Sequence, residues 1–339
     1  MDAALLGTHF ERETSEQPSV WERIAKSGQS ERLANALEDD AILIGNGSSL
    51  FVAQLGALAL RRRRFRAQAL AATEARLDCN AYQNKTVVAI SQSGQSTDVL
   101  EALDFLRPRR VIALTNTPGS ALTARADVVV DVQAGPEIAV PASKSVSSTV
   151  AILLGAASRL SGESKRDAVV LLQTAAEVRA WLDSSALQDT IGAARRIALR
   201  RSVVFLGSDY GLPIASEAAL KLKEAAYLHA EGFAAGEFSH GSIAMVDASV
   251  AVLGIADSDA LPVLLRPFEE LAKVDVRRYI IGTSPIGDVP RLGPDVPDAY
   301  NTLAWLVTVQ TIALHVARAR GVDSDAPRHL TKVVIAKQT

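Results

Sequence analysis

The chain has few of the features that would place it in a disulfide-rich or membrane class. It contains a single cysteine, Cys79, in 339 residues, so an intrachain disulfide and a cysteine-rich zinc site are both excluded. No apolar run reaches 18 residues without a charge, and no basic segment followed by an apolar one opens the chain. Neither a membrane span nor a signal peptide is therefore expected, and we predict a cytoplasmic protein with no metal.

The chain also lacks a strong net charge. Its formal charge is −2 at pH 7, so no bulk electrostatic attraction to nucleic acid or to an anionic membrane is expected, and neither is a predicted partner. The run from Arg61 to Arg64 is a local exception that follows an Ala- and Leu-rich helical stretch. We interpret it as cations that complete a helix C-terminus on a solvated face, in preference to a nucleic-acid patch.

Apolar residues are abundant, at 48% of the chain, which is enough for a large core. They gather in short runs separated by helical stretches of about 10 to 18 residues. This alternation predicts parallel sheets with helices on both faces. The predicted strands are 41–45, 86–91, 110–116, 127–132, 202–207, 249–256 and 277–282.

The chain reads as two similar halves. "AILIGNGSSLFVAQLGALAL" and "SVVFLGSDYGLPIASEAALKL" each give a strand, a Gly-containing turn and a helix. Two α/β domains are the simplest explanation. We predict an N-terminal segment over 1–30, a first domain over 31–165, a linker helix over 166–194 and a second domain over 195–339.

The turn "SQSGQST" is crowded with hydroxyl groups from Ser91, Ser93, Ser96 and Thr97, and Gly94 would let a ligand approach the backbone. It follows a predicted strand, at the edge of the sheet where open α/β folds bind ligands and where the next helix offers free N–H groups. An ordinary N-cap needs only one or two of these hydroxyls. The turn therefore favours binding of a phosphate monoester.

A second group of polar residues lies on a helix that we predict over 213–233, with Pro213 near its first turn and Gly232 near its end. Glu217, Lys221 and Glu224 are spaced i, i+4, i+7 and share one face. A solvated stripe of ion pairs would explain most such triplets. The segment that follows favours an active site instead.

That segment, "AEGFAAGEFSHGSIAMVD", is rich in Gly and Ala and is predicted to be a loop that carries Glu237 and His240. Loops of this kind beside a charged helix face are typical of active sites. His240 could act as an acid or a base near neutral pH. His229, inside the predicted helix, is expected to be a packing residue.

Four segments together resemble the sugar isomerase (SIS) family: "SQSGQSTD", "GPEIAVPASKS", "EAALKLKEAAYLHAEGFAAGEFSHGSIAMVD" and "DAPRHLTK". The resemblance is greatest to the isomerase domain of glutamine–fructose-6-phosphate aminotransferases and to stand-alone SIS-type glucosamine-6-phosphate deaminases. It extends from "THFERETSEQPSVW" to Lys332. It implies two tandem SIS domains, each a three-layer α/β/α sandwich with a flavodoxin-like parallel sheet, and no cofactor.

The resemblance also implies roles for single residues. Glu224 corresponds to the base that moves a proton between C1 and C2, and Lys221 to its electrostatic partner. His240 corresponds to the ring-opening histidine, which the second subunit of a homodimer supplies. Val140 lines the sugar site, and Lys332 can form a Schiff base with the ketose. The positions that bind phosphate are Ser48, Ser49, Ser91, Gln92, Ser93 and Ser96.

The reaction expected from the resemblance depends on the source of ammonia. The synthases begin with an amidotransferase domain that carries an N-terminal cysteine, whereas this sequence begins Met1-Asp2-Ala3. Without channelled ammonia we expect hydrolytic deamination of glucosamine 6-phosphate, or a close amino-sugar phosphate, to fructose 6-phosphate and ammonia. The alternatives are a phosphosugar isomerase or fructosamine-type deglycase, and a non-catalytic sugar-phosphate-binding regulator. Pro141 and Ala142 stand where the family usually has hydroxyls, which leaves the sugar open.

Overall fold

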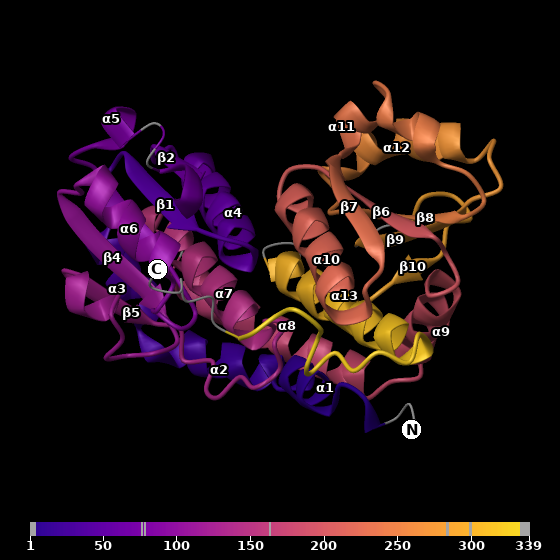
Figure 1. Ribbon diagram of the computed structural model, residues 1–339, viewed down its shortest axis with the longest axis horizontal. Coiled ribbons are helices and arrows are strands. Elements are labelled where there is room, and N and C mark those ends of the chain that lie inside the picture. The colour runs from indigo at the N-terminus through magenta and orange to yellow at the C-terminus, as the bar shows by residue number, and fades with distance from the viewer. Residues whose placement is uncertain are drawn as a thin grey trace. The chain divides into compact units, whose positions relative to one another are not determined.

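The computed structural model describes residues 5–332 apart from 76, 78, 163, 283, 284, 298 and 299. It divides into two compact units, shown as ribbons in Figure 1. We call them the N-terminal unit (Ser19–Glu137, Lys144–Leu172 and the residues from Thr331) and the C-terminal unit (Met1–Pro18, Ile138–Ser143 and Gln173–Leu330). Each unit is built around its own parallel sheet.

The N-terminal unit contains a five-stranded parallel sheet of order β2-β1-β3-β4-β5. Its strands are β1 (Ala41–Gly45), β2 (Ala67–Ala71), β3 (Thr86–Ile90), β4 (Arg110–Thr115) and β5 (Val128–Asp131). β1 and β3 are buried along their whole length, because a parallel sheet is covered on both faces.

Helices cover both faces of this sheet. On one face, apolar side chains of β1, β3 and β4 pack with α6. On the other, α4 lies so close that a Cβ at Gly56 would come within 3.0 Å of both Leu43 and Leu153. The helices of this unit are most of α2 (Gln17–Ser27), α3 (Gln29–Ala36), α4 (Ser48–Arg62), α5 (Cys79–Tyr82), α6 (Thr97–Leu106), α7 (Lys144–Leu160) and the start of α8 (Ser164–Leu182), with short 3-10 turns η2 (Ala72–Glu74) and η3 (Thr123–Arg125).

The C-terminal unit repeats this plan with a parallel sheet of order β10-β9-β8-β6-β7. Its strands are β6 (Ser202–Gly207), β7 (His229–Ala234), β8 (Val250–Ala256), β9 (Arg277–Gly282) and β10 (Arg291–Leu292). Side chains of α11 and α12 pack with β6 and β8 in an apolar cluster, and α13 contacts α9 and α10. The helices are α1 (Thr8–Ser15), the end of α8, α9 (Ala186–Ile197), α10 (Gly211–Ala226), α11 (Ala235–Phe238), α12 (Leu261–Leu271) and α13 (Asn301–Ala319), with η4 (Ser242–Met245).

The predicted α/β class with two parallel sheets is confirmed. Numbered within its own unit, each sheet has the strand order 2-1-3-4-5 of flavodoxin-like folds. α4 ends at Arg62 with Arg61 in its last turn, as the helix interpretation of the arginine run predicted. No helix among the described residues combines the length and the hydropathy that a membrane span requires.

The helix predicted over residues 213–233 was wrong beyond Ala226. The helix α10 ends there, Tyr227 adopts a left-handed conformation (φ 52°), and β7 follows. Tertiary contacts stabilise this unusual backbone, because the Tyr227 hydroxyl accepts a hydrogen bond from the Arg328 N–H (2.6 Å) and the Arg328 guanidinium lies 4.3 Å from the ring centroid. His229 is consequently exposed on β7 instead of packed inside a helix.

Candidate functional site

The strand order brings two hydroxyl-rich turns together in the N-terminal unit. β1 and β3 are parallel neighbours, but α4 leads from β1 to β2 and α6 leads from β3 to β4, on opposite sides. Such a switch point is where open α/β sheets bind ligands. The Asn46 side-chain amide donates to the Asp98 carboxylate (3.0 Å) and links the two turns. Ser48 and Ser49 begin α4 after the first turn, and Gln92, with three of the predicted serines, belongs to the second.

The second turn is held in one conformation by the end of β4. The Gln92 carbonyl accepts hydrogen bonds from the Asn116 N–H (3.0 Å) and from the hydroxyls of Thr115 and Thr117 (3.2 Å each). Gly94 has a φ of 62°, and a Cβ at this position would collide with Ser120. Glycine is therefore required here both by the backbone conformation and by the lack of space.

The hydroxyls of this turn are placed for a ligand more than for helix capping. The Ser91 hydroxyl accepts the Gly94 N–H (3.1 Å) and the Ser93 hydroxyl accepts the Gln95 N–H (3.2 Å), which leaves each hydroxyl its own hydrogen to donate. Ser96 is the N-cap residue of α6, yet its side chain makes no capping hydrogen bond. With the positive end of the helix dipole behind them, these groups suit a tetrahedral anion.

Lys332 lies in the same unit and contacts a carboxylate that the sequence patterns did not single out. Its Nζ is 3.2 Å from Oε2 of Glu137, whose side chain is fully buried. Glu137 also accepts hydrogen bonds from the Ser145 N–H (3.1 Å) and hydroxyl (2.7 Å) at the start of α7. The helix N-terminus and the ammonium group together compensate the buried charge. Glu137 thereby holds Lys332 on the N-terminal unit.

The charged face of α10 is buried and is not a solvated stripe. Lys221 Nζ lies 2.5 Å from Glu224 Oε2 and 3.5 Å from Glu217 Oε1. The side chains of Lys221 and Glu217 are 1% exposed, whereas that of Glu224 is 22% exposed. A buried ammonium group therefore holds two carboxylates, and Glu224 is the one that solvent, or a substrate, can reach.

His240 and Val140 belong to the C-terminal unit. His240 is exposed between α11 and η4, and within the described part of the chain its ring forms no hydrogen bond or ion pair. The predicted loop was partly wrong, because β7 and α11 occupy 229–238 and separate His240 from α10. The Val140 N–H donates to the Asp325 carbonyl (3.3 Å). The structure thus pairs Lys221 with Glu224 but does not pair His240 with either.

The chain is similar to several known proteins. A glutamine–fructose-6-phosphate aminotransferase [isomerizing] of Mycolicibacterium smegmatis is 36% identical over 267 residues, which are 73% of this chain and 42% of that protein. The chain therefore matches less than half the length of this relative. Two solved structures share the fold. One is a glucosamine-6-phosphate deaminase from Thermotoga maritima, with a TM-score of 0.82 and 22% identity, and the match covers 97% of this chain and 100% of that one. The other is a tagatose-6-phosphate ketose/aldose isomerase from Escherichia coli, with a TM-score of 0.81 and 20% identity, and the match covers 100% of this chain and 99% of that one.

The family follows from a match to both halves of the chain. The model of the SIS domain matches residues 36–159 and 196–315. The first match contains β1 to β5 with the two hydroxyl-rich turns, and the second contains β6 to β10 with the charged face of α10. The chain belongs to the SIS domain family and carries two tandem SIS domains, each with a five-stranded parallel sheet.

Proposed function

We propose that this protein is a phosphosugar aldose–ketose isomerase whose main reaction is hydrolytic deamination of glucosamine 6-phosphate, or a close amino-sugar phosphate, to fructose 6-phosphate and ammonia. The observation that carries the proposal is the partly exposed Glu224 carboxylate, held by the buried Lys221 ammonium. A carboxylate fixed beside a cation can remove a proton next to a carbonyl or imine while the cation stabilises the negative charge that develops.

The proposed reaction assigns a step to the predicted residues other than Lys332. Ser48, Ser49, Ser91, Gln92, Ser93 and Ser96 bind the phosphate, and Val140 lines the sugar site. His240 of a second subunit opens the ring by proton transfer to and from the ring oxygen. Glu224 takes the proton from C2 and returns it to C1, while one proton of the C2 amine passes to the C1 oxygen, so that the aldehyde becomes an alcohol and the amine becomes a ketimine. One water adds to the ketimine and ammonia leaves, so that amino-sugar phosphate plus water gives ketose phosphate plus ammonia.

Two considerations support the hydrolytic direction. An ammonium ion has a pKa well above 7, so the free amine needed for the reverse reaction is scarce at neutral pH. A solved structure with the same fold is described as a glucosamine-6-phosphate deaminase.

A second candidate is isomerisation or deglycation of a related sugar phosphate. The pair formed by Lys332 and the buried Glu137 favours it, because a fixed lysine amine can form an imine with a ketose. A ketose/aldose isomerase also shares the fold.

We also propose a homodimer with shared active sites, because the exposed His240 ring has no partner within the described residues of its own chain.

The functional test is incubation with a panel of hexosamine and ketosamine 6-phosphates, while ammonia and ketose phosphate are measured together. Equal amounts of both products from an aldose amine support the deaminase. Ketose phosphate without ammonia would favour the isomerase. No turnover of any sugar phosphate would favour a non-catalytic sugar-phosphate-binding regulator.

A further inference from the structure

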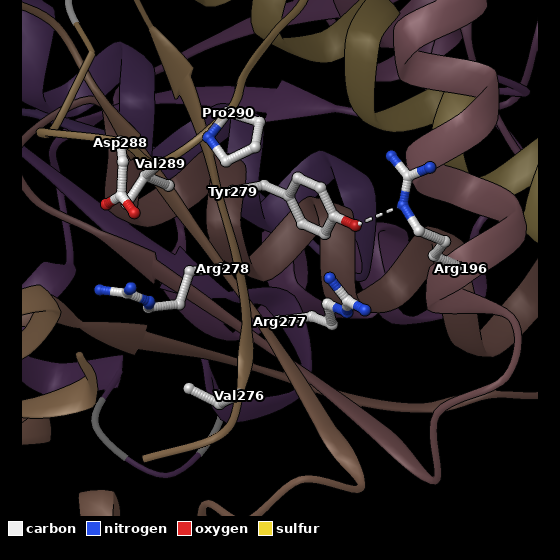
Figure 2. A pocket seen from close by; sticks show the side chains of 8 residues that line it. All are labelled: Arg196, Val276, Arg277, Arg278, Tyr279, Asp288, Val289 and Pro290. Carbon is white, nitrogen blue, oxygen red and sulfur yellow. Dashed lines mark hydrogen bonds between the residues drawn. The ribbon is translucent and has the colours of Figure 1, made fainter. Parts of the chain in front are cut away.

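A cavity of about 350 Å³ lies in the C-terminal unit at the amino end of β9, and none of the residues assigned above lines it. It is lined by residues of α9, of β9 and its lead-in, and of the segment before β10: Arg196, Val276, Arg277, Arg278, Tyr279, Asp288, Val289 and Pro290 (Figure 2). Its volume lies within the range of small-molecule sites. Its charged groups are three guanidinium groups and one carboxylate, so the cavity is positively charged.

Two of the arginines flank a nearly buried hydroxyl group. Arg277 and Tyr279 alternate along β9 and so share one face of the strand, and in Figure 2 Arg196 and Arg277 lie on either side of the Tyr279 hydroxyl. Tyr279 is 3% exposed, and its hydroxyl accepts a hydrogen bond from Arg196 Nε at 3.2 Å. This bond orients the Arg196 guanidinium and leaves the phenol hydrogen free to be donated.

The third arginine, Arg278, forms a structural hydrogen bond elsewhere. Arg278 is on the opposite face of β9, where its Nη1 donates to the Phe268 carbonyl of α12 at 3.1 Å. Within the described residues, neither Arg196 nor Arg277 forms an ion pair, although Asp288 lines the same cavity. Two guanidinium groups and a phenol therefore face the cavity without an anionic partner.

This donor set selects the chemistry of a ligand. Guanidinium groups bind phosphate and carboxylate through paired N–H donors. Donors from three side chains on two elements fit the oxygens of a tetrahedral anion better than the two oxygens of a planar carboxylate. Ordinary surface arginines that complement the C-terminus of α9 would explain the charge, but they would not explain the hydrogen bond to a buried hydroxyl.

We infer that this cavity is a second, non-catalytic site that binds a phosphate monoester of a small polyhydroxyl compound. Arg196, Arg277 and Tyr279 bind the phosphate, and Asp288 accepts hydrogen bonds from the hydroxyl groups. The site uses none of the residues assigned to the catalytic reaction.

The experiment must first weaken phosphate binding at the turn between β3 and α6. The background protein is therefore the double variant Ser91→Ala/Ser93→Ala. Inorganic phosphate is titrated at constant ionic strength, with acetate as the planar anion, and binding is followed by the thermal unfolding midpoint and by ³¹P line broadening. We expect phosphate, but not acetate, to raise the midpoint.

Variants of the cavity then locate the site. In the same background, Arg196→Gln, Arg277→Gln and Tyr279→Phe are each expected to weaken phosphate binding about tenfold, because each removes a donor to an anion. Arg195→Gln, which changes the neighbouring exposed arginine of α9, is the control and should leave binding unchanged. Arg277 is exposed, so its variant tests the site even if Tyr279→Phe does not fold.

An equal response to acetate, or unchanged phosphate binding in the Arg277→Gln and Arg196→Gln variants, would overturn the inference and leave an adventitious ion only. The proposed function is tested separately. With the catalytic turn intact, Arg277→Gln should turn over the amino-sugar phosphate at the rate of the unchanged protein. Loss of phosphate binding in this variant therefore supports the second site whether or not the protein proves to be a deaminase.

Discussion

At the scale of single residues, Lys221 determines the environment of two carboxylates on α10. Its ammonium group is buried between Glu217 and Glu224, at 3.5 and 2.5 Å. Burial of a charge is costly unless opposite charges accompany it. Lys221 therefore contributes to stability, in addition to its role in the proposed reaction.

We predict that Lys221→Met destabilises the protein by about 3 to 5 kcal/mol, because the buried Glu217 carboxylate loses this cation. Urea unfolding at pH 7 measures the loss. Lys223→Met, on the exposed side of the same helix turn, is the matched control and should change the free energy of unfolding by less than about 0.5 kcal/mol. Equal losses in the two variants would show that the buried pair has no special role in stability.

His315 gives the protein a pH-dependent stability. Burial, with a smaller contribution from the charge of Arg318 in the same direction, lowers the pKa of His315 from the ordinary value of 6.5 to about 4. Between these two pH values the unfolded chain binds a proton that the folded chain does not, so stability falls as the pH falls from 6.5 to 4.

The prediction concerns the slope of that loss. The unfolding free energy of His315→Gln should decrease less between pH 6.5 and pH 4.5 than that of the unchanged protein. This range is chosen to avoid the titration of the neighbouring Glu11 carboxyl, whose pKa is lowered chiefly by its hydrogen bond to Arg318. His229→Gln, on exposed β7, is the control. Identical slopes in the unchanged protein and in His315→Gln would contradict the assignment.

At the scale of elements, the buried central strands were predictable, whereas the edge strands β2 and β7 were not. β1, β3 and β4 are apolar because both faces of a parallel sheet are covered. β2 has the sequence AQALA, and alanine has a low strand propensity. β7 lies at the other sheet's edge with exposed His229 and Glu231. Nothing local marks these two segments as strands, because hydrogen bonds to a neighbouring strand define them.

The same limit applies to the candidate site. The spacing of Glu217, Lys221 and Glu224 predicted one helix face, but spacing does not distinguish a solvated face from a buried one. Glu137 was missed because its role depends on contacts that no local pattern marks, with Ser145 at the start of α7 and with Lys332, which is far away in the sequence. Its signal was a lone acid in the otherwise uncharged segment "GPEIAV".

The turn between β3 and α6 carries the prediction for substrate binding. Replacing Ser91 and Ser93 by Ala should raise KM for the phosphorylated sugar at least tenfold and change kcat far less, because the phosphate is bound alike in the ground and transition states. The unphosphorylated sugar is the control substrate, and its kcat/KM should not change. A loss in kcat with KM unchanged would refute the phosphate-binding role.

At the scale of the whole molecule, the two SIS domains divide the proposed work. The two hydroxyl-rich turns and Lys332 lie in the N-terminal unit, and Glu224 and His240 lie in the C-terminal unit. The sequence boundaries 31–165 and 195–339 remain a prediction, as does the cytoplasmic location. Sequence reasoning did not foresee that residues to Pro18 and 138–143 group with the C-terminal unit, because such grouping depends on long-range contacts.

The proposed dimer is testable by mixing inactive subunits. Glu224→Gln and His240→Ala proteins should each be inactive, and subunit exchange should restore about a quarter of the wild-type activity. Half of the dimers are then mixed, and one of the two pockets in each contains both intact residues. No recovery after exchange has been confirmed by mass would mean that both residues act within one chain.

The most direct test of the central claim is exchange of the substrate C2 proton with solvent. In D₂O, the wild-type protein should incorporate deuterium into hexosamine 6-phosphate during turnover, as followed by proton NMR. Glu224→Gln should fold normally, because the amide keeps the shape of the side chain, but should slow the exchange at least a hundredfold through loss of the base. Exchange at the wild-type rate in Glu224→Gln would contradict the account and would place the base elsewhere, with Glu237 the next residue to test.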